Sequence, residues 1–309
     1  MAKGNPNNGG TEHVSVLALD FEDLTPGMQQ YQEAKRAHPD CLIMLRMGDF
    51  YEMFYEDAIT ASKELEITLT SRGKGDKRAP LAGVPFHALD TYLSRLIRKG
   101  YKVAIVEQLE DPRKAKGLVQ RGIVRIVTPG TIIESSMLNE KENNYLLALT
   151  AHGETLTTAF CDLSTGDFFL KILPGLSELH AELARYAPSE ILIPVSLLVN
   201  RELCSLLKQN GSFVNMLDDY HFRSERGREL LQQHFQLGTL DSFGLDDKGI
   251  AVAGALLRYL VDTQKNTLSH LKKIAVHSNS STMLLDPSTI RNLELVGNIR
   301  EGSLRGTLL

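Results

Sequence analysis

The chain has 309 residues, of which 42% are hydrophobic and 23% charged, and its formal net charge at pH 7 is −4. This length fits about two domains and part of a third, and this charge argues against a generally basic coat for nucleic acid. No apolar run approaches the roughly 20 residues that span a bilayer, and residues 1–10 are polar, so the sequence indicates neither a membrane span nor a secretory signal segment.

Residues 1–23 are expected to form a flexible tail, after which helical and strand patterns alternate. Helices are predicted to begin near Pro26, Phe50 and His87. Strands are predicted at residues 41–47, 66–72, 101–108 and 123–128. Because Pro129 and Gly130 mark the end of this alternation, the sequence predicts a mixed-sheet α/β domain over residues 24–130.

Within this domain, four of the chain's 11 phenylalanines and 9 tyrosines fall within six positions, at residues 50, 51, 54 and 55. The apolar run at residues 41–45 predicts a buried strand before them, and residues 48–49 predict a turn. Asp49 is a good N-cap, so a helix is expected to follow it with Phe50 and Glu52 in its first turn.

Met53 and Phe54 begin an apolar stripe at helical spacing, and these side chains are expected to lie in the core. Phe50 falls outside that stripe. An aromatic side chain at a strand-to-helix corner can act as a wedge between bases, and a carboxylate two residues later can accept a hydrogen bond from a base edge. Phe50 and Glu52 are therefore candidate site residues.

Charge is distributed unevenly along the first domain. Residues 20–69 hold 4 basic and 11 acidic side chains, a balance of −7, whereas residues 70–125 hold 13 basic and 5 acidic, a balance of +8. Basic side chains in two loops can reach a phosphate backbone: Arg72, Lys74, Lys77, Arg78, Lys114, Lys116 and Arg121. The alternative is a solvated face, which is the favoured interpretation for the helix-associated Arg95, Arg98, Lys99 and Lys102.

The second half of the chain predicts another α/β domain. Residues 131–143, rich in glutamate, serine and asparagine, are expected to be a linker, and the domain is expected to cover residues 144–265. It opens with strand-like segments and later contains an apolar helix, at residues 146–150, 155–161, 168–172 and 251–261. Residues 266–309 are expected to begin a helical domain.

The stretch RMGDFYEMF at residues 46–54 resembles the Phe-X-Glu mismatch-reading motif of the MutS family of DNA mismatch-repair proteins. The resemblance runs from about Leu24 to Leu309, and Leu118 departs from it where the family usually has proline. Further segments resemble the family in the same order, at residues 25–31, 82–87, 116–131, 162–168, 188–192 and 284–295. The resemblance implies that Phe50 is the wedge and Glu52 the acceptor, and it favours backbone contact by the two basic loops.

The same resemblance implies a mismatch-recognition domain, an RNase H-like connector domain and the start of a helical lever domain. It implies that the partners are duplex DNA with mismatches or small loops, a MutL-like protein at the connector domain and a second copy of the full-length protein. Neither a membrane nor an extracellular site is implied; the expected place is the cytoplasm, at the nucleoid.

The sequence contains no G-x-x-x-x-G-K-[ST] motif, the loop and lysine that hold nucleotide phosphates. The chain is therefore expected to be an N-terminal fragment without the family's ATPase and clamp. It is expected to be no enzyme and to hold no cofactor, whereas the full-length family member uses ATP and magnesium.

Two other classes of function remain open. An enzyme could use paired carboxylates in the aromatic segment, or nuclease metal ligands at Asp162 and Asp167, although these two flank a Ser-Thr-Gly turn where aspartate is expected for turn chemistry. A pure interaction module is the third interpretation. Cys41, Cys161 and Cys204 are far apart and indicate reduced thiols rather than a metal or disulfide framework.

Overall fold

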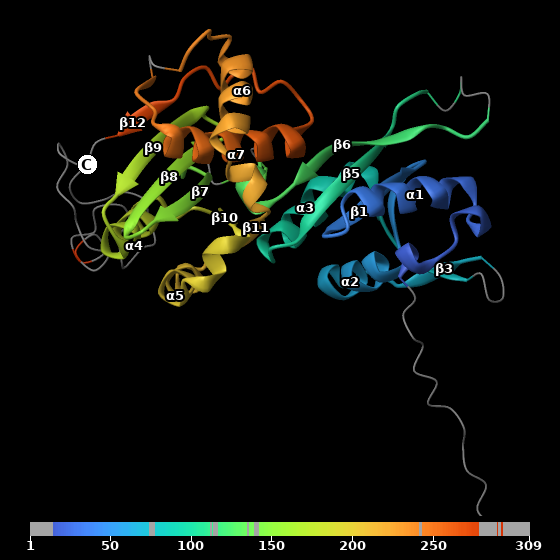
Figure 1. Ribbon diagram of the computed structural model, residues 1–309. Coiled ribbons are helices and arrows are strands. Elements are labelled where there is room, and N and C mark those ends of the chain that lie inside the picture. Colours follow the sequence, from blue (N-terminus) through green and yellow to red (C-terminus); the bar gives the residue numbers. More distant parts are fainter. Residues whose placement is uncertain are drawn as a thin grey trace, which may run out of the picture. The chain divides into compact units, whose positions relative to one another are not determined.

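A computed structural model describes residues 15–73, 78–111, 113, 117–134, 136–138, 142–240 and 243–277, together with residues 289 and 292. The chain divides into two compact units, residues 1–126 and residues 127–309 (Figure 1). Within the described residues, no helix has the length and apolar character that crossing a membrane requires. The domain limits proposed from the sequence stay predictions, and the expected helical domain at 266–309 lies mostly outside the described residues.

The first unit is built on a six-stranded mixed sheet with the strand order β3-β4-β2-β1-β5-β6. β1 pairs in parallel with β5 and antiparallel with β2, and β4 pairs antiparallel with β2 and β3. The strands are β1 (Cys41–Met47), β2 (Phe50–Phe54), β3 (Thr70–Arg72), β4 (Ala79–Pro85), β5 (Lys102–Gln108) and β6 (Arg121–Val127). This is the mixed-sheet α/β fold that the sequence predicts.

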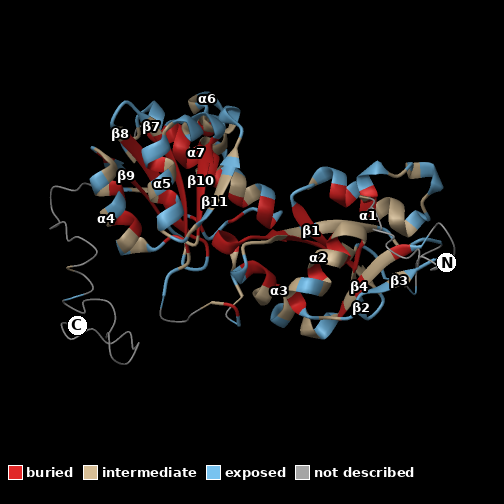
Figure 2. Cartoon of the chain, turned by 90° about the horizontal axis from the view of Figure 1, so that it is seen from below, coloured by how far each residue is buried: buried red, intermediate tan, exposed pale blue. Residues whose placement is uncertain are grey.

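Three helices cover this sheet: α1 (Pro26–Ala37), α2 (Tyr55–Leu65) and α3 (Leu89–Arg98). Figure 1 shows α1 on one face and α2 with α3 on the other. The core on the α1 side joins Tyr31 to strand residues such as Ile43 and Phe54, which alternate with side chains buried on the opposite face. Burial is concentrated in the strands and on the helix sides that face them (Figure 2).

The prediction of a helix beginning at Phe50 is wrong, because residues 50–54 form β2 and the helix begins at Tyr55. Gly48 has φ +61°, a conformation that glycine adopts without steric penalty, and it turns the chain so that Phe50 pairs with Met47. Asp49 is not the N-cap; that position falls to Phe54, without a side-chain hydrogen bond. The pattern of a short apolar run fits a strand and a helix equally well. Pairing with β1 and β4 stabilises the strand here.

The first segment that the structure describes also differs from the sequence prediction of a flexible tail. Residues 15–23, expected to be part of a flexible tail, form two short 3₁₀ helices, Val16–Ala18 and Phe21–Asp23. Val16 is fully buried, and its backbone N–H donates to Glu56 over 3.0 Å. This segment therefore belongs to the core of the first unit.

The second unit has a sheet in the order β11-β10-β7-β8-β9-β12. Three strands form an antiparallel meander, and β10 and β11 then add in parallel beside β7. The strands are β7 (Tyr145–His152), β8 (Thr155–Asp162), β9 (Asp167–Leu173), β10 (Glu190–Pro194), β11 (Phe213–Leu217) and β12 (Ala275–His277). An antiparallel meander extended by parallel strands is the arrangement expected of an RNase H-like domain.

Helices enclose this sheet in two separate cores. One core lies against α6 (Ser224–Phe235) and α7 (Asp247–Gln264), and the other against α4 (Leu176–Tyr186) and α5 (Arg201–Gln209). α6 and α7 approach closely at Gly227 and Gly254, because a Cβ on Gly254 would lie 2.2 Å from the Cα of Gly227. The strands and the apolar helix predicted for this unit are confirmed.

Candidate nucleic-acid interface

Phe50 and Glu52 lie on the same face of β2, since side chains alternate along a strand. Phe54 shares this face but is fully buried under α1, where its ring meets that of Tyr31 edge to face at 5.2 Å. Phe50, four residues earlier, is 47% exposed. β2 therefore runs between the surface and the core. At its exposed end, which begins at Phe50 and is called its open end, it presents an apolar ring and a carboxylate together.

The turn that carries Phe50 is held from both sides. The backbone N–H of Phe86 donates to the carbonyl of Asp49 over 2.9 Å. The Arg46 guanidinium lies 4.0 Å from the centre of the Phe86 ring, and its Nε donates to the Gly48 carbonyl. The hydrogen bonds to the carbonyls of Asp49 and Gly48 fix the direction in which Phe50 leaves the turn.

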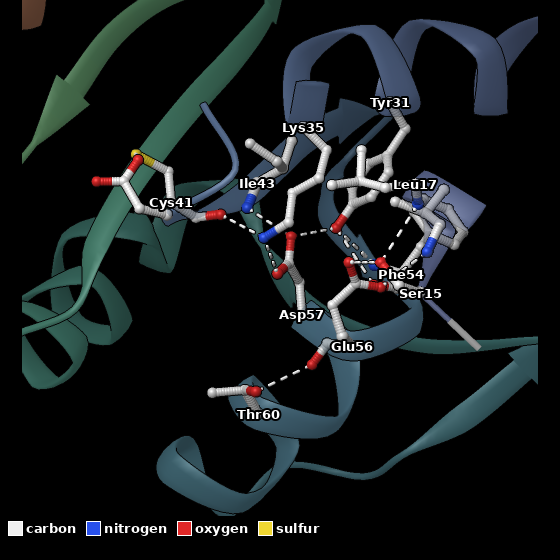
Figure 3. A network of polar contacts seen from close by, with 12 residues as sticks. Ser15, Leu17, Tyr31, Lys35, Cys41, Ile43, Phe54, Glu56, Asp57 and Thr60 are labelled. Carbon is white, nitrogen blue, oxygen red and sulfur yellow. Dashed lines mark hydrogen bonds and ion pairs between the residues drawn. The ribbon is translucent and has the colours of Figure 1, made fainter. Parts of the chain in front are cut away.

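The other end of β2 is fixed by a buried polar network around Asp57 (Figure 3). The Tyr31 hydroxyl and the Lys35 ammonium donate to the Asp57 carboxylate over 2.6 and 2.7 Å. The backbone N–H of Ile43 in β1 donates to it over 2.9 Å. Burial raises the pKa of Asp57, against the opposing effect of Lys35. The network ties α1, α2 and β1 at the corner where β2 passes into α2.

Glu52 forms an ion pair with Arg72, with Nη1 and Oε2 separated by 2.9 Å. The Glu52 side chain is 20% exposed and that of Arg72 56%. Burial raises the pKa of Glu52 above its usual 4.5, and the positive charges of Arg72 and Arg121 oppose this shift without reversing it. The carboxylate is thus partly desolvated and has one exposed cation beside it.

Gly83 of β4 pairs with Glu52 and leaves the surface beside both candidate residues uncovered. A Cβ at Gly83 would lie 3.9 Å from Cδ1 of Phe50 and 3.8 Å from Cγ of Glu52, which are ordinary contact distances. The glycine is therefore not required by crowding within the chain. The sequence analysis did not single out Gly83, because only the register of β2 against β4 reveals its place.

The basic residues predicted to contact a phosphate backbone differ in their surroundings. Arg78 is exposed and its Nε donates to the Ser71 hydroxyl. Arg121 is held at several points: it donates to the carbonyls of Arg46 and Val119 over 2.8 and 3.0 Å and to the Gln30 amide oxygen over 3.2 Å. The remaining members of the set lie outside the described residues: Lys74, Lys77, Lys114 and Lys116.

Other basic and acidic groups considered in the sequence analysis make surface ion pairs or turn hydrogen bonds. Lys99 pairs with Glu64 and Lys102 with Asp40, over 2.8 and 2.6 Å, as expected of a solvated face. Asp162 accepts hydrogen bonds from the backbone N–H and the hydroxyl of Ser164, over 2.8 and 2.7 Å, which is turn chemistry. In the part of the chain that the structure describes, no group of three or more histidine, cysteine or carboxylate side chains is arranged to hold a metal ion.

Together the two units define a two-domain α/β protein whose first domain presents an aromatic ring and a carboxylate at the open end of one strand. Residues 25–136 match the family model for MutS domain I, and residues 144–272 match that for MutS domain II. The chain belongs to the MutS family.

Similar proteins carry the name DNA mismatch repair protein MutS. The one from Lachnoclostridium phytofermentans is 45% identical over 290 residues, which cover 93% of this chain and 31% of that protein. Those from Methanosarcina barkeri and Methanosarcina acetivorans are each 48% identical and cover 90% and 93% of this chain, at 33% and 34% of their own lengths. The chain thus spans about a third of the length of these relatives.

Proposed function

We propose that this chain recognises mispaired or looped bases in duplex DNA and acts in DNA mismatch repair. Phe50 wedges against the mispaired base, and Glu52 accepts a hydrogen bond from it. One observation carries the proposal: Phe50 is 47% exposed on the same strand face as Glu52, although Phe54 on that face is fully buried. Family membership and the names of the relatives support it.

The discrimination follows from the mechanics of DNA. Inserting an apolar wedge unstacks a base step, at about a few kcal/mol for a paired step and less for a mismatched one. A mispaired or bulged site is also softer to bend than a regular duplex. Phe50 therefore enters most easily where pairing has already failed, and the protein favours such sites through deformability.

Glu52 adds a second element of selectivity. A carboxylate facing DNA is repelled by the phosphates of every duplex, and this repulsion weakens binding. The lost binding free energy is offset only where a displaced base donates a hydrogen bond to the carboxylate. The backbone itself would be held by the other basic residues of the two loops: Lys74, Lys77, Arg78, Lys114, Lys116 and Arg121. Arg72, which the sequence places in the same set, lies on Glu52. Phe50 supplies the apolar contact, and Glu52 penalises matched DNA.

The second unit is the proposed docking site for a MutL-like partner, and dimerisation, ATP and magnesium are proposed for the longer family members. For this chain we propose no nucleotide site, since its sequence contains no G-x-x-x-x-G-K-[ST] motif. No step of mismatch recognition is assigned to ATP in this chain.

The test is binding of the chain to a matched duplex and to the same duplex with a G·T mismatch, at one fixed salt concentration. The wild-type chain is expected to prefer the mismatch. Glu52→Gln is expected to raise affinity for the matched duplex and lower the mismatch-to-match ratio, and Glu52→Ala to do so more severely. An unchanged ratio in both variants removes Glu52 from the site, and DNA cleavage that depends on a divalent metal would favour the nuclease alternative.

A further inference from the structure

The ion pair between Arg72 and Glu52 joins a residue of the proposed site to the edge of the sheet. Arg72 is the last residue of β3, the edge strand, and Glu52 lies on β2 with β4 between them. The Nη1 of Arg72 lies 2.9 Å from Oε2 of Glu52. Beside Glu52, β4 presents Gly83, which has no side chain to shield the carboxylate.

The two partners of this ion pair have unequal freedom. The Arg72 side chain is 56% exposed, whereas that of Glu52 is 20% exposed. Between described residues, the Glu52 carboxylate accepts a side-chain hydrogen bond from Arg72. Arg121 also influences the charge of Glu52, but its guanidinium is held by the carbonyls of Arg46 and Val119. Arg72 is therefore the cation that can move away from the Glu52 carboxylate.

We propose that Arg72 is an internal counter-ion of Glu52 that competes with a displaced base for this carboxylate and thereby limits the preference for mismatched over matched DNA. This inference rests on the proposed function, in which Glu52 accepts a hydrogen bond from the mispaired base. On a matched duplex Arg72 stays on Glu52 and reduces, without abolishing, the repulsion between this carboxylate and the phosphates. At a mismatch the base takes the place of Arg72.

This role differs from the backbone contact that the sequence predicts for Arg72. A residue that contacts only phosphate supports every duplex alike, and its loss weakens binding uniformly and lowers the salt slope by about one. An internal counter-ion acts through Glu52, so its loss changes the mismatch-to-match ratio only while the carboxylate is present. Arg78 on the same hairpin has no contact with Glu52 in the structure and provides the matched control.

The first test needs no DNA. The pKa of Glu52 is measured by NMR titration of its carboxyl carbon in the full chain. Arg72→Ala is expected to raise the pKa of Glu52, because an adjacent positive charge favours the ionised form, and Arg78→Ala is expected to leave it unchanged. The proposal is overturned if Arg72→Ala leaves the pKa of Glu52 where it is in the wild-type chain.

The second test is a double-mutant cycle on DNA binding at fixed salt. Arg72→Ala leaves an unpaired carboxylate facing the phosphates of a matched duplex, while a displaced base binds that carboxylate without competition. The mismatch-to-match ratio is therefore expected to rise by about 1.5- to 5-fold, the range that an exposed ion pair supports. In the Glu52→Gln background the same substitution is expected to leave the ratio unchanged.

Each outcome has a separate meaning. Equal losses on both duplexes, as expected for Arg78→Ala, identify Arg72 as a phosphate contact and contradict the proposal. If the wild-type chain itself shows no mismatch preference, the proposed function fails, while the NMR titration still decides whether Arg72 neutralises Glu52. Circular dichroism of each variant checks that the hairpin change leaves the fold intact.

Discussion

Phe50 and Glu52 are two residues apart, and on a strand this spacing sends both side chains to the same face. In a helix, residues i and i+2 do not face each other. The strand therefore explains what the Phe-X-Glu spacing does: it lets one ligand meet the ring and the carboxylate together. The helical first turn predicted from the sequence would have separated them.

Glu52→Gln is expected to raise the free energy of unfolding at pH 7. Burial raises the pKa of Glu52 above 4.5 in the folded chain, so the folded state binds this proton more tightly than the unfolded state does. The resulting loss of stability is fully present above the raised pKa and disappears as the pH falls through it towards 4.5. Urea unfolding at several pH values should show the difference between wild type and variant shrinking over this window.

A lower stability of Glu52→Gln at pH 7 would contradict this account. It would mean that the ion pair with Arg72 outweighs the burial of the carboxylate in the folded chain.

At the scale of elements, the sequence predicted strands β1, β5 and β6 and the meander of the second unit, because each is a long apolar or alternating run. It did not predict β4 (Ala79–Pro85), and it failed at β2, which has only five residues. There Met53 and Phe54 are buried on opposite faces of one strand, and their spacing from Ala58 and Leu65 imitates a helical stripe. The burial of Tyr51, which that stripe does not include, distinguishes the strand.

Asp57→Ala is expected to lower the free energy of unfolding by about 3–5 kcal/mol, because removing one partner of a buried ion pair leaves the other uncompensated. Lys35 and the Tyr31 hydroxyl would both lose their buried acceptor. The exposed Asp49 is the control, and its replacement by alanine should change stability by less than about 0.5 kcal/mol. Similar urea midpoints for both variants would show that the network does not hold the corner of β2 and α2.

Gly83→Ala tests the open surface of β4. The added methyl group meets Phe50 and Glu52 at ordinary contact distances, so the fold should persist while the group occupies the place beside both side chains. Affinity for mismatched duplex is expected to fall with little change in melting temperature. Gly238→Ala, at a position with open space around it, is the control; equal mismatch affinity for the two variants would show that DNA does not approach Gly83.

For the molecule as a whole, the resemblance located the candidate residues, but the sequence could not show their contacts. Arg72 and Glu52 are 20 positions apart, and their ion pair depends on how the β3–β4 hairpin folds over β2. Asp57 is one of the carboxylates that follow the aromatic segment, and only the packing of α1 against β1 and α2 buries it. Contacts of this kind come from strand register and helix packing, which composition and periodicity do not determine.

Nucleotide binding is a second whole-molecule prediction. The chain is expected neither to bind nor to hydrolyse ATP, since its 309 residues contain no phosphate-binding loop with the G-x-x-x-x-G-K-[ST] pattern. Isothermal titration calorimetry with ATP and magnesium should give no saturable heat. Saturable binding would reveal a nucleotide site that the sequence motif does not describe.

The most direct test of mismatch recognition is to compare Phe50→Ala with Phe86→Ala in binding to matched and G·T duplexes at one salt concentration. Both rings are exposed, by 47% and 42%, at neighbouring strand ends, and the backbone bond of Phe86 to Asp49 survives its substitution. Phe50→Ala should remain folded and lose about 1–3 kcal/mol of affinity for the mismatch, the worth of one base stack, whereas Phe86→Ala should keep the wild-type preference. A Phe50→Ala chain that still prefers the G·T duplex as strongly as wild type would contradict the account.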